Sequence, residues 1–179
     1  NLSELLQAFT SAEIQQTSEL RQMIKSSLLD LQARGLGGVV CNVSFRNYLK
    51  DENQWALFTL AIDVCREIGF RVWIYDEDGY PSAAAGGRVL EVSAAFEAQE
   101  LVLDATGEPP YTIRASYEGT HASNNYYMAR RYPNLIDQGA ITTFTQVTHD
   151  AYAQRVAKDF GGMSGAFFTD EPSLVACNL

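Results

Sequence analysis

Two short acidic stretches contain the residues whose types and spacing could carry out chemistry. Asp76, Glu77 and Asp78 directly follow one apolar run, and Asp170 and Glu171 follow a second one. Gly or Pro comes after each stretch and breaks the strand pattern. The carboxyl ends of parallel strands meet at the same edge of a sheet or barrel. The sequence therefore predicts that the two acidic strand ends form one site.

Glu171 is the candidate general acid of this site. A carboxylic acid beside aromatic and apolar side chains can have its pKa raised by desolvation, so that it protonates a leaving oxygen near neutral pH. Alternation along a strand predicted over 165–171 places Glu171 and Asp170 on opposite faces, with Glu171 pointing into the site and Asp170 supporting it. A helix cap or a surface acid is the alternative interpretation of this stretch.

The three consecutive carboxylates at 76–78 repel one another unless something compensates their charge. Asp76, Glu77 and Asp78 therefore predict hydrogen bonds to substrate hydroxyls, a calcium site built from oxygen ligands, or a solvated turn. The flanking sequences Val-Trp-Ile-Tyr and Tyr-Pro-Ser favour a functional interpretation.

Aromatic and basic side chains near the strand ends are candidates for sugar binding. Trp73 and Tyr80 flank the first acidic stretch, and their rings could stack on the apolar faces of sugars. Arg46 follows the first predicted strand and is expected on the same rim. Ordinary packing is the alternative for the aromatic residues, and an ordinary loop is the alternative for Arg46.

The elements that must position these residues alternate between helix and strand. Thr10 and Glu13 form the pattern of a capping box, and the sequence predicts helix from there to about residue 34. Strands are predicted over 39–44 and 70–75, with a helix that starts at Asp51 between them. The step from strand to strand is roughly 30 residues, the size of a βαβ unit.

The second half of the chain is less regular. Short strands are expected at 101–103 and 111–113 around a Gly-Pro turn. Asp137 is expected to cap a last helix, whose inward residues are predicted to be Phe144, Val147, Tyr152 and Val156. The strand over 165–171 follows.

This pattern predicts the α/β class, with parallel strands, covering helices and an inserted β-rich loop. Three such strands are visible, whereas a closed (β/α)8 barrel needs eight. We therefore expect residues 1–179 to be a single domain that forms part of a larger barrel. A smaller open α/β sheet is the alternative.

Composition excludes several function classes. The formal net charge of −9 argues against nucleic acid or an anionic membrane as a partner. No apolar run approaches the roughly 20 residues of a membrane span. Cys41, Cys65 and Cys177 lack CxxC spacing, which favours buried thiols, and His121 and His149 alone cannot build a zinc site. Composition alone leaves the cellular location open.

Two stretches of the sequence resemble a known enzyme family. These are residues 73–82 (Trp-Ile-Tyr-Asp-Glu-Asp-Gly-Tyr-Pro-Ser) with 85–87 (Ala-Gly-Gly), and residues 165–173 (Gly-Ala-Phe-Phe-Thr-Asp-Glu-Pro-Ser). They are similar to large TIM-barrel glycoside hydrolases grouped with the α-L-rhamnosidases of glycoside hydrolase family 106. Residues 134–137 and 148–152 are similar to the segment before the second acidic strand in that group.

The resemblance implies hydrolysis of O-glycosidic bonds, with Glu171 as general acid, inversion at the anomeric carbon, a calcium ion and a secreted or periplasmic location. Two features depart from the family. Its members usually have Pro-Ser-Gly where this chain has Pro81-Ser82-Ala83. The strands that would carry the second catalytic carboxylate are not visible here.

We therefore expect part of a glycoside hydrolase domain whose partner is a carbohydrate. Unpaired sheet edges also predict contact with the remainder of a barrel or self-association. A non-catalytic carbohydrate-binding module on the same fold is the main alternative. A metal-dependent sugar isomerase is a weaker one, because it would require more His or Lys at the strand ends.

Overall fold

A computed structural model describes residues 10–43, 47–78, 81–116 and 131–174. The chain divides into two compact units. The first consists of Asn1–Tyr75 with Ala151–Phe168, and the second of Asp76–Asp150 with Thr169–Leu179.

The first unit begins with helices α2 (Ser11–Gln16) and α3 (Ser18–Ala33). The predicted capping box is confirmed, since the Thr10 and Glu13 side chains each accept the backbone N–H of the other residue. The sequence predicted one continuous helix, but it is interrupted at Thr17, which has an extended backbone. Both helices pack on α4 through a small apolar cluster of Ile14, Leu20, Ala56 and Leu60.

Helix α4 (Glu52–Ile68) has the predicted start and end. The Asp51 carboxylate accepts the N–H groups of Asn53 and Gln54, which satisfies backbone donors that the first turn leaves free. Gly69 ends the helix in the left-handed conformation with φ +69°. The helix buries most of its apolar residues: Trp55, Ala56, Phe58, Leu60, Ile62, Val64 and Cys65.

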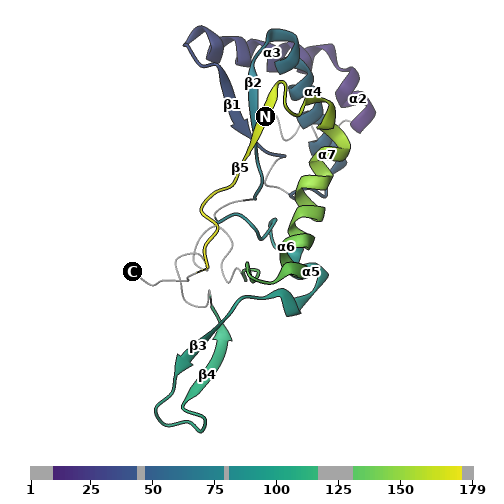
Figure 1. Cartoon of the computed structure of the whole chain (residues 1–179). Helices are drawn as coiled ribbons and strands as arrows, with labels where there is room; N and C mark the ends of the chain where they lie inside the picture. Colours follow the sequence, from purple (N-terminus) through teal and green to yellow (C-terminus); the bar gives the residue numbers. More distant parts are fainter. Residues whose placement is uncertain (1–9, 44–46, 79–80, 117–130, 175–179) are drawn as a thin grey trace. The chain divides into compact units, whose positions relative to one another are not determined.

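A parallel sheet forms the centre of this unit (Figure 1). Its strands are β1 (Gly38–Cys41), β2 (Arg71–Tyr75) and β5 (Ser164–Phe168), in the order β1-β2-β5. Residues alternate along β2, so that Val72 and Ile74 are completely buried. The predicted parallel strands are therefore confirmed, although β1 and β5 are shorter than expected.

Helices cover one face of the sheet. Helix α7 (Ala151–Val156) is followed by the short helix η3 (Ala157–Asp159). The buried ring of Tyr152 makes edge contacts with Trp55 and Phe58 of α4 and with Phe167 of β5, and its hydroxyl accepts the Val43 N–H at 3.0 Å. These contacts join α4, α7 and β5 into one core.

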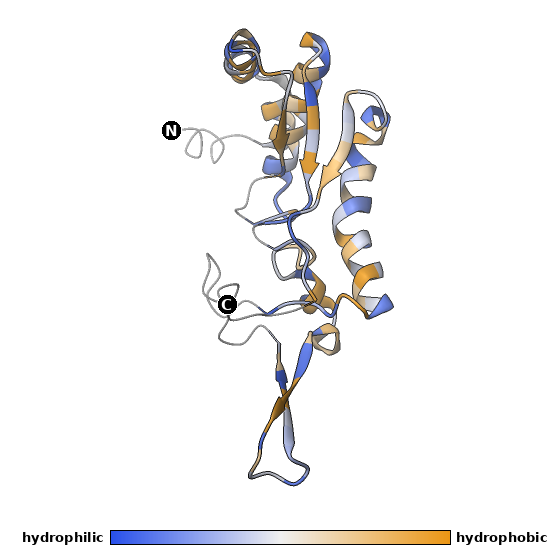
Figure 2. Cartoon of the chain, turned by 60° about the vertical axis from the view of Figure 1, so that its left-hand side comes forward, coloured by the Kyte–Doolittle hydropathy of each residue, from blue (hydrophilic) through white to orange (hydrophobic). Residues whose placement is uncertain are grey.

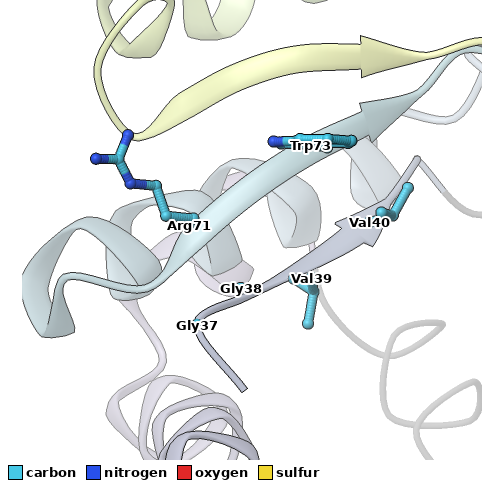
Figure 3. Close-up of a pocket in the computed structure, with 6 residues that line it drawn as sticks. All are labelled: Gly37, Gly38, Val39, Val40, Arg71 and Trp73. Carbon is cyan, nitrogen blue, oxygen red and sulfur yellow. The ribbon is translucent and has the colours of Figure 1, made fainter. Parts of the chain in front are cut away.

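The other face of the sheet is open among the described residues. Val40, Trp73 and Phe168 keep 52%, 48% and 40% of their surface exposed. Figure 2 shows hydrophobic colour on these strands. An open hollow of about 420 Å³ is lined by residues 37–40 together with Arg71 and Trp73. Figure 3 shows Trp73 at one side of this hollow and Arg71 at the other.

The second unit is built from short elements. They are helix α5 (Arg88–Val92), the one-turn helix η1 (Ala94–Phe96), the antiparallel strands β3 (Gln99–Leu103) and β4 (Tyr111–Ala115), and helix α6 (Gln138–Thr145), which leads into the π-helix η2 (Gln146–Asp150). The predicted β-rich insertion is confirmed as the β3–β4 hairpin. Asp137 caps α6 as predicted, accepting the Ala140 N–H at 3.0 Å.

The fold class is therefore mixed α/β, with a three-stranded parallel sheet and covering helices. The described residues contain no closed barrel, so a complete TIM barrel is not present in this part of the chain. Among the same residues, no helix is long and apolar enough to cross a membrane.

The prediction of buried thiols is confirmed for Cys65, whereas Cys41 is only partly buried. Cys41 and Cys65 carry free thiols. Burial raises the pKa of Cys41 to about 12, with a smaller contribution from Cys65, and burial raises the pKa of Cys65 to about 11. Both thiols therefore stay neutral at physiological pH. Cys177 lies outside the described residues.

Candidate active site

The two acidic stretches meet at Asp76, within the second unit. Asp76 directly follows β2 in the sequence, and Thr169 directly follows β5. The Asp76 carboxylate is completely buried, and its Oδ2 accepts the Thr169 hydroxyl at 2.6 Å. This distance lies within the usual range for a hydroxyl that donates to a carboxylate oxygen. The convergence predicted from the sequence is therefore present at this residue pair.

Ser82 forms a second connection between the two stretches. Its hydroxyl donates to Asp76 Oδ1 at 2.8 Å and accepts the Asp170 N–H at 2.9 Å. Its own N–H donates to the Asp170 carbonyl at 2.9 Å. The buried Tyr132 hydroxyl donates to the Ser82 carbonyl. Asp170 is thus held through its backbone, next to the carboxylate of Asp76.

Glu77 is buried and organises the loop that follows it. Its carboxylate accepts four backbone N–H groups, from Asp78, Ala83, Ala85 and Gly86, at 2.6–3.1 Å. A carboxylate offers about four acceptor positions. The described structure therefore gives Glu77 the role of ordering residues 83–86, and its predicted contact with substrate stays a prediction.

This loop has an unusual backbone. Ala83 has φ +114° and Ala85 has φ +51°, in the region that glycine favours. Gly86 has φ +61°, and a Cβ there would lie 2.9 Å from Asp78 Oδ2. Both the conformation and the space at position 86 therefore favour glycine. The departure from Pro-Ser-Gly puts a strained alanine at position 83.

His149 is a site residue that the sequence analysis missed. Its Nε2 lies 3.2 Å from Asp76 Oδ2, and its ring packs edge-on against Phe144 with centroids 5.3 Å apart. The side chain keeps 32% of its surface exposed. Sequence reasoning considered this histidine as a zinc ligand and as part of the 148–152 segment that resembles the family, but not as a site residue. A π-helical turn leaves no recognisable pattern in one sequence.

Glu171 lies beyond the end of β5. The strand ends at Phe168, so the prediction of a strand to Glu171 is wrong, and the alternation argument for its direction no longer applies. The residue is exposed, whereas the burial of its carboxyl group was expected. Its backbone has φ +40°, a strained conformation of the kind that concentrates at functional sites.

The remaining candidates are divided between the units. Asp78 is buried in the second unit beside Gly86. Trp73 is half-exposed on the open face of the sheet in the first unit, where it borders the hollow of Figure 3. Arg46 and Tyr80 lie outside the described residues.

The described part of the chain does not fit the expected calcium ion. It contains no group of three or more His, Cys, Asp or Glu side chains placed to hold a metal. The oxygens of Asp76 and Glu77 are instead engaged by hydroxyl, imidazole and backbone groups. These oxygens would have to give up their present hydrogen bonds to bind a cation.

Comparisons with protein-family models, curated proteins and solved structures found no significant match to this chain. The geometry of the site and the resemblance of the two acidic stretches are therefore the grounds on which a function can be proposed.

Proposed function

We propose that this chain is part of a glycoside hydrolase whose substrate is a carbohydrate with an O-glycosidic bond. The observation that carries the proposal is the junction of the two acidic strand ends, where Asp76 accepts the Thr169 hydroxyl and Ser82 binds Asp170. Barrel enzymes build their active sites from residues that follow neighbouring parallel strands. Glu171 follows Asp170 directly in the sequence, which supports the proposal that it belongs to the same site.

We also propose that the sheet is a portion of a larger (β/α)8 domain. The order β1-β2-β5 is the order expected if the β3–β4 hairpin is an insertion between consecutive barrel strands. Parallel sheets are almost always covered on both faces, whereas here the described residues cover only one. The remaining strands would complete the barrel and supply the second catalytic group.

Within this proposal Glu171 protonates the leaving oxygen. A general acid matters most for a poor leaving group, because a good one departs without a proton. Glu171→Gln in the complete natural gene product should therefore lower kcat about 10²–10⁴-fold on an alkyl glycoside and far less on a dinitrophenyl glycoside. Steady-state kinetics on both, starting with α-L-rhamnosides, make the comparison.

Glu108→Gln is the matched control, since Glu108 is an exposed residue of the same unit. It should leave both rates unchanged. Full activity of Glu171→Gln on the alkyl glycoside would refute the role of Glu171. An equal loss on both substrates would place the residue in binding rather than in proton transfer.

The exposed Trp73 ring favours a second candidate function, a carbohydrate-binding module without catalysis. The ring borders an open hollow whose other lining residues are small or aliphatic, apart from Arg71. Titration with oligosaccharides while tryptophan fluorescence is recorded separates the two functions. A saturable signal without product release would favour the binding module.

A further inference from the structure

Ser82 holds the chain on both sides of Asp170. The Ser82 hydroxyl oxygen accepts the Asp170 N–H at 2.9 Å, and the Ser82 N–H donates to the Asp170 carbonyl at 2.9 Å. The first bond fixes the peptide group before Asp170, and the second fixes the peptide group after it. Because a peptide group is planar, the second bond also fixes the backbone nitrogen of Glu171. Ser82 therefore sets the direction in which the chain enters Glu171.

Ser82 is itself firmly held. In addition to the two bonds with Asp170, its hydroxyl binds Asp76 Oδ1 at 2.8 Å, and its carbonyl accepts the Tyr132 hydroxyl. Every polar group of the residue thus takes part in a hydrogen bond, and the residue is completely buried. Buried polar networks whose members are all satisfied are rigid. Ser82 is therefore a rigid anchor for the segment that leads to Glu171.

The backbone conformation of Glu171 requires support of this kind. Its φ angle of +40° lies in the region that glycine favours. Pro172 follows it, and a residue before proline prefers an extended backbone with negative φ. A conformation that opposes both preferences persists only where the neighbouring structure determines it. The peptide group that Ser82 holds lies directly on the N-terminal side of this residue.

A role for Ser82 as a nucleophile does not fit these contacts. A serine nucleophile donates to an adjacent base and must also reach the substrate. The Ser82 hydroxyl is instead engaged by both Asp76 and the Asp170 N–H, and the residue has no exposed surface. Ser82 therefore acts through the segment that it holds.

We propose that Ser82 is the positioning residue of Glu171. This rests on the proposed glycoside hydrolysis, in which Glu171 protonates the leaving oxygen. A general acid must lie within hydrogen-bond reach of the oxygen that it protonates. Misplacement by about 1 Å lowers the rate on the order of 10²-fold. Ser82 fixes the backbone from which the Glu171 carboxyl group extends, and so keeps the acid within that tolerance.

The first test measures the backbone and does not depend on turnover. Ser82→Ala in the complete natural gene product removes the acceptor of the Asp170 N–H, so hydrogen exchange at that amide should become about 2–10-fold faster. Ser116→Ala is the matched control, because Ser116 is a buried serine of the same unit whose hydroxyl has no hydrogen-bond partner among the described residues. It should leave exchange at Asp170 unchanged. Unchanged exchange in Ser82→Ala would overturn the proposal.

The second test measures hydrolysis. Ser82→Ala should lower kcat about 10–100-fold on an alkyl glycoside and far less on a dinitrophenyl glycoside, with little change in KM. Ser116→Ala should leave both rates unchanged. If Ser82→Ala does not fold, Ser82→Cys replaces it, since a thiol is similar in shape to the hydroxyl and is only a weak acceptor.

A double mutant separates positioning from general structural support. In the Glu171→Gln background the acid is already lost, so Ser82→Ala should lower the rate on the alkyl glycoside by less than about 2-fold. A similar loss in both backgrounds would show that Ser82 does not act through Glu171. An equal loss on the two substrates would indicate a structural role, and either result would overturn the proposal.

The outcomes distinguish this proposal from the proposed function. A loss of alkyl glycoside hydrolysis in Glu171→Gln but not in Ser82→Ala would overturn the role of Ser82 and leave the glycosidase proposal standing. Full activity of Glu171→Gln would refute the roles of both residues. No hydrolysis of any glycoside by the unaltered protein would overturn the glycosidase proposal, and the positioning role of Ser82 with it.

Discussion

At Ala83 a methyl group occupies a backbone conformation that suits glycine. The φ angle of +114° is one that side-chain-bearing residues rarely adopt, and strain of this kind costs about 1–3 kcal/mol. The residue persists there because its N–H donates to Glu77 and the surrounding loop is buried. Removing the Ala83 methyl group tests whether this backbone conformation is strained.

Ala83→Gly should stabilise the protein by about 1 kcal/mol. Strain at the upper end of the range of about 1–3 kcal/mol exceeds the cost of about 1–2 kcal/mol from the added flexibility of glycine and the lost buried methyl. Urea unfolding measures the difference. Ala84→Gly is the control, since Ala84 is also buried but does not have a positive φ angle, and it should destabilise the protein. Destabilisation by both changes would refute the strain argument.

Residue-scale predictions from the sequence succeeded where the cause is local. Thr10, Asp51 and Asp137 were predicted as helix caps, and each accepts a backbone N–H within three residues. His149 and Asp76 are 73 residues apart, and nothing in the sequence pairs them. The roles that depend on long-range contacts therefore could not be predicted from the sequence.

At the scale of elements, the loop over residues 83–86 depends on one side chain. Glu77 supplies both oxygens to its backbone, and the loop leads into α5. An isolated run of N–H groups that is buried away from water costs free energy unless an acceptor satisfies it. The Glu77 carboxylate therefore satisfies the backbone N–H groups of this loop, as backbone carbonyl groups do within a helix.

Glu77→Gln should destabilise the second unit by about 2–3 kcal/mol. The amide has one acceptor oxygen, and its NH₂ group would face backbone donors that then lose their partner. Hydrogen exchange should show faster exchange at the Ala85 and Gly86 amides, and urea unfolding should show the loss of stability. The exposed Glu108→Gln is the control. Unchanged exchange at both amides would show that the loop does not depend on the carboxylate.

Element types were predictable from the sequence because apolar periodicity reports them directly. The residues at which elements end were harder to predict from the sequence. The N-terminal helix is interrupted at Thr17, and β5 ends at Phe168, directly before the residue whose hydroxyl donates to Asp76. That second difference removed the alternation argument for Glu171. The acidic junction was predictable from two strand ends, but the direction of its side chains was not.

At the scale of the whole molecule, the parallel sheet has unsatisfied surfaces. In the described sheet β1 and β5 are edge strands, and the face that carries Val40, Trp73 and Phe168 is open. Parallel strands are normally buried on both faces. Exposed apolar faces and unpaired edges favour association with other chains.

We therefore expect this chain, produced alone, to associate reversibly as its concentration rises, as sedimentation velocity would show. Val40→Lys should shift it toward the monomer, because burial of an ammonium group at that face is costly. Its free energy of unfolding should change by less than about 0.5 kcal/mol, since the Val40 side chain is half-exposed.

Leu103→Lys, at an exposed residue of the β3–β4 hairpin, is the control and should leave association unchanged. If Leu103→Lys alone reduced association, the hairpin rather than the sheet would be the contact surface. A chain that stays monomeric without either change would mean that neither surface drives association.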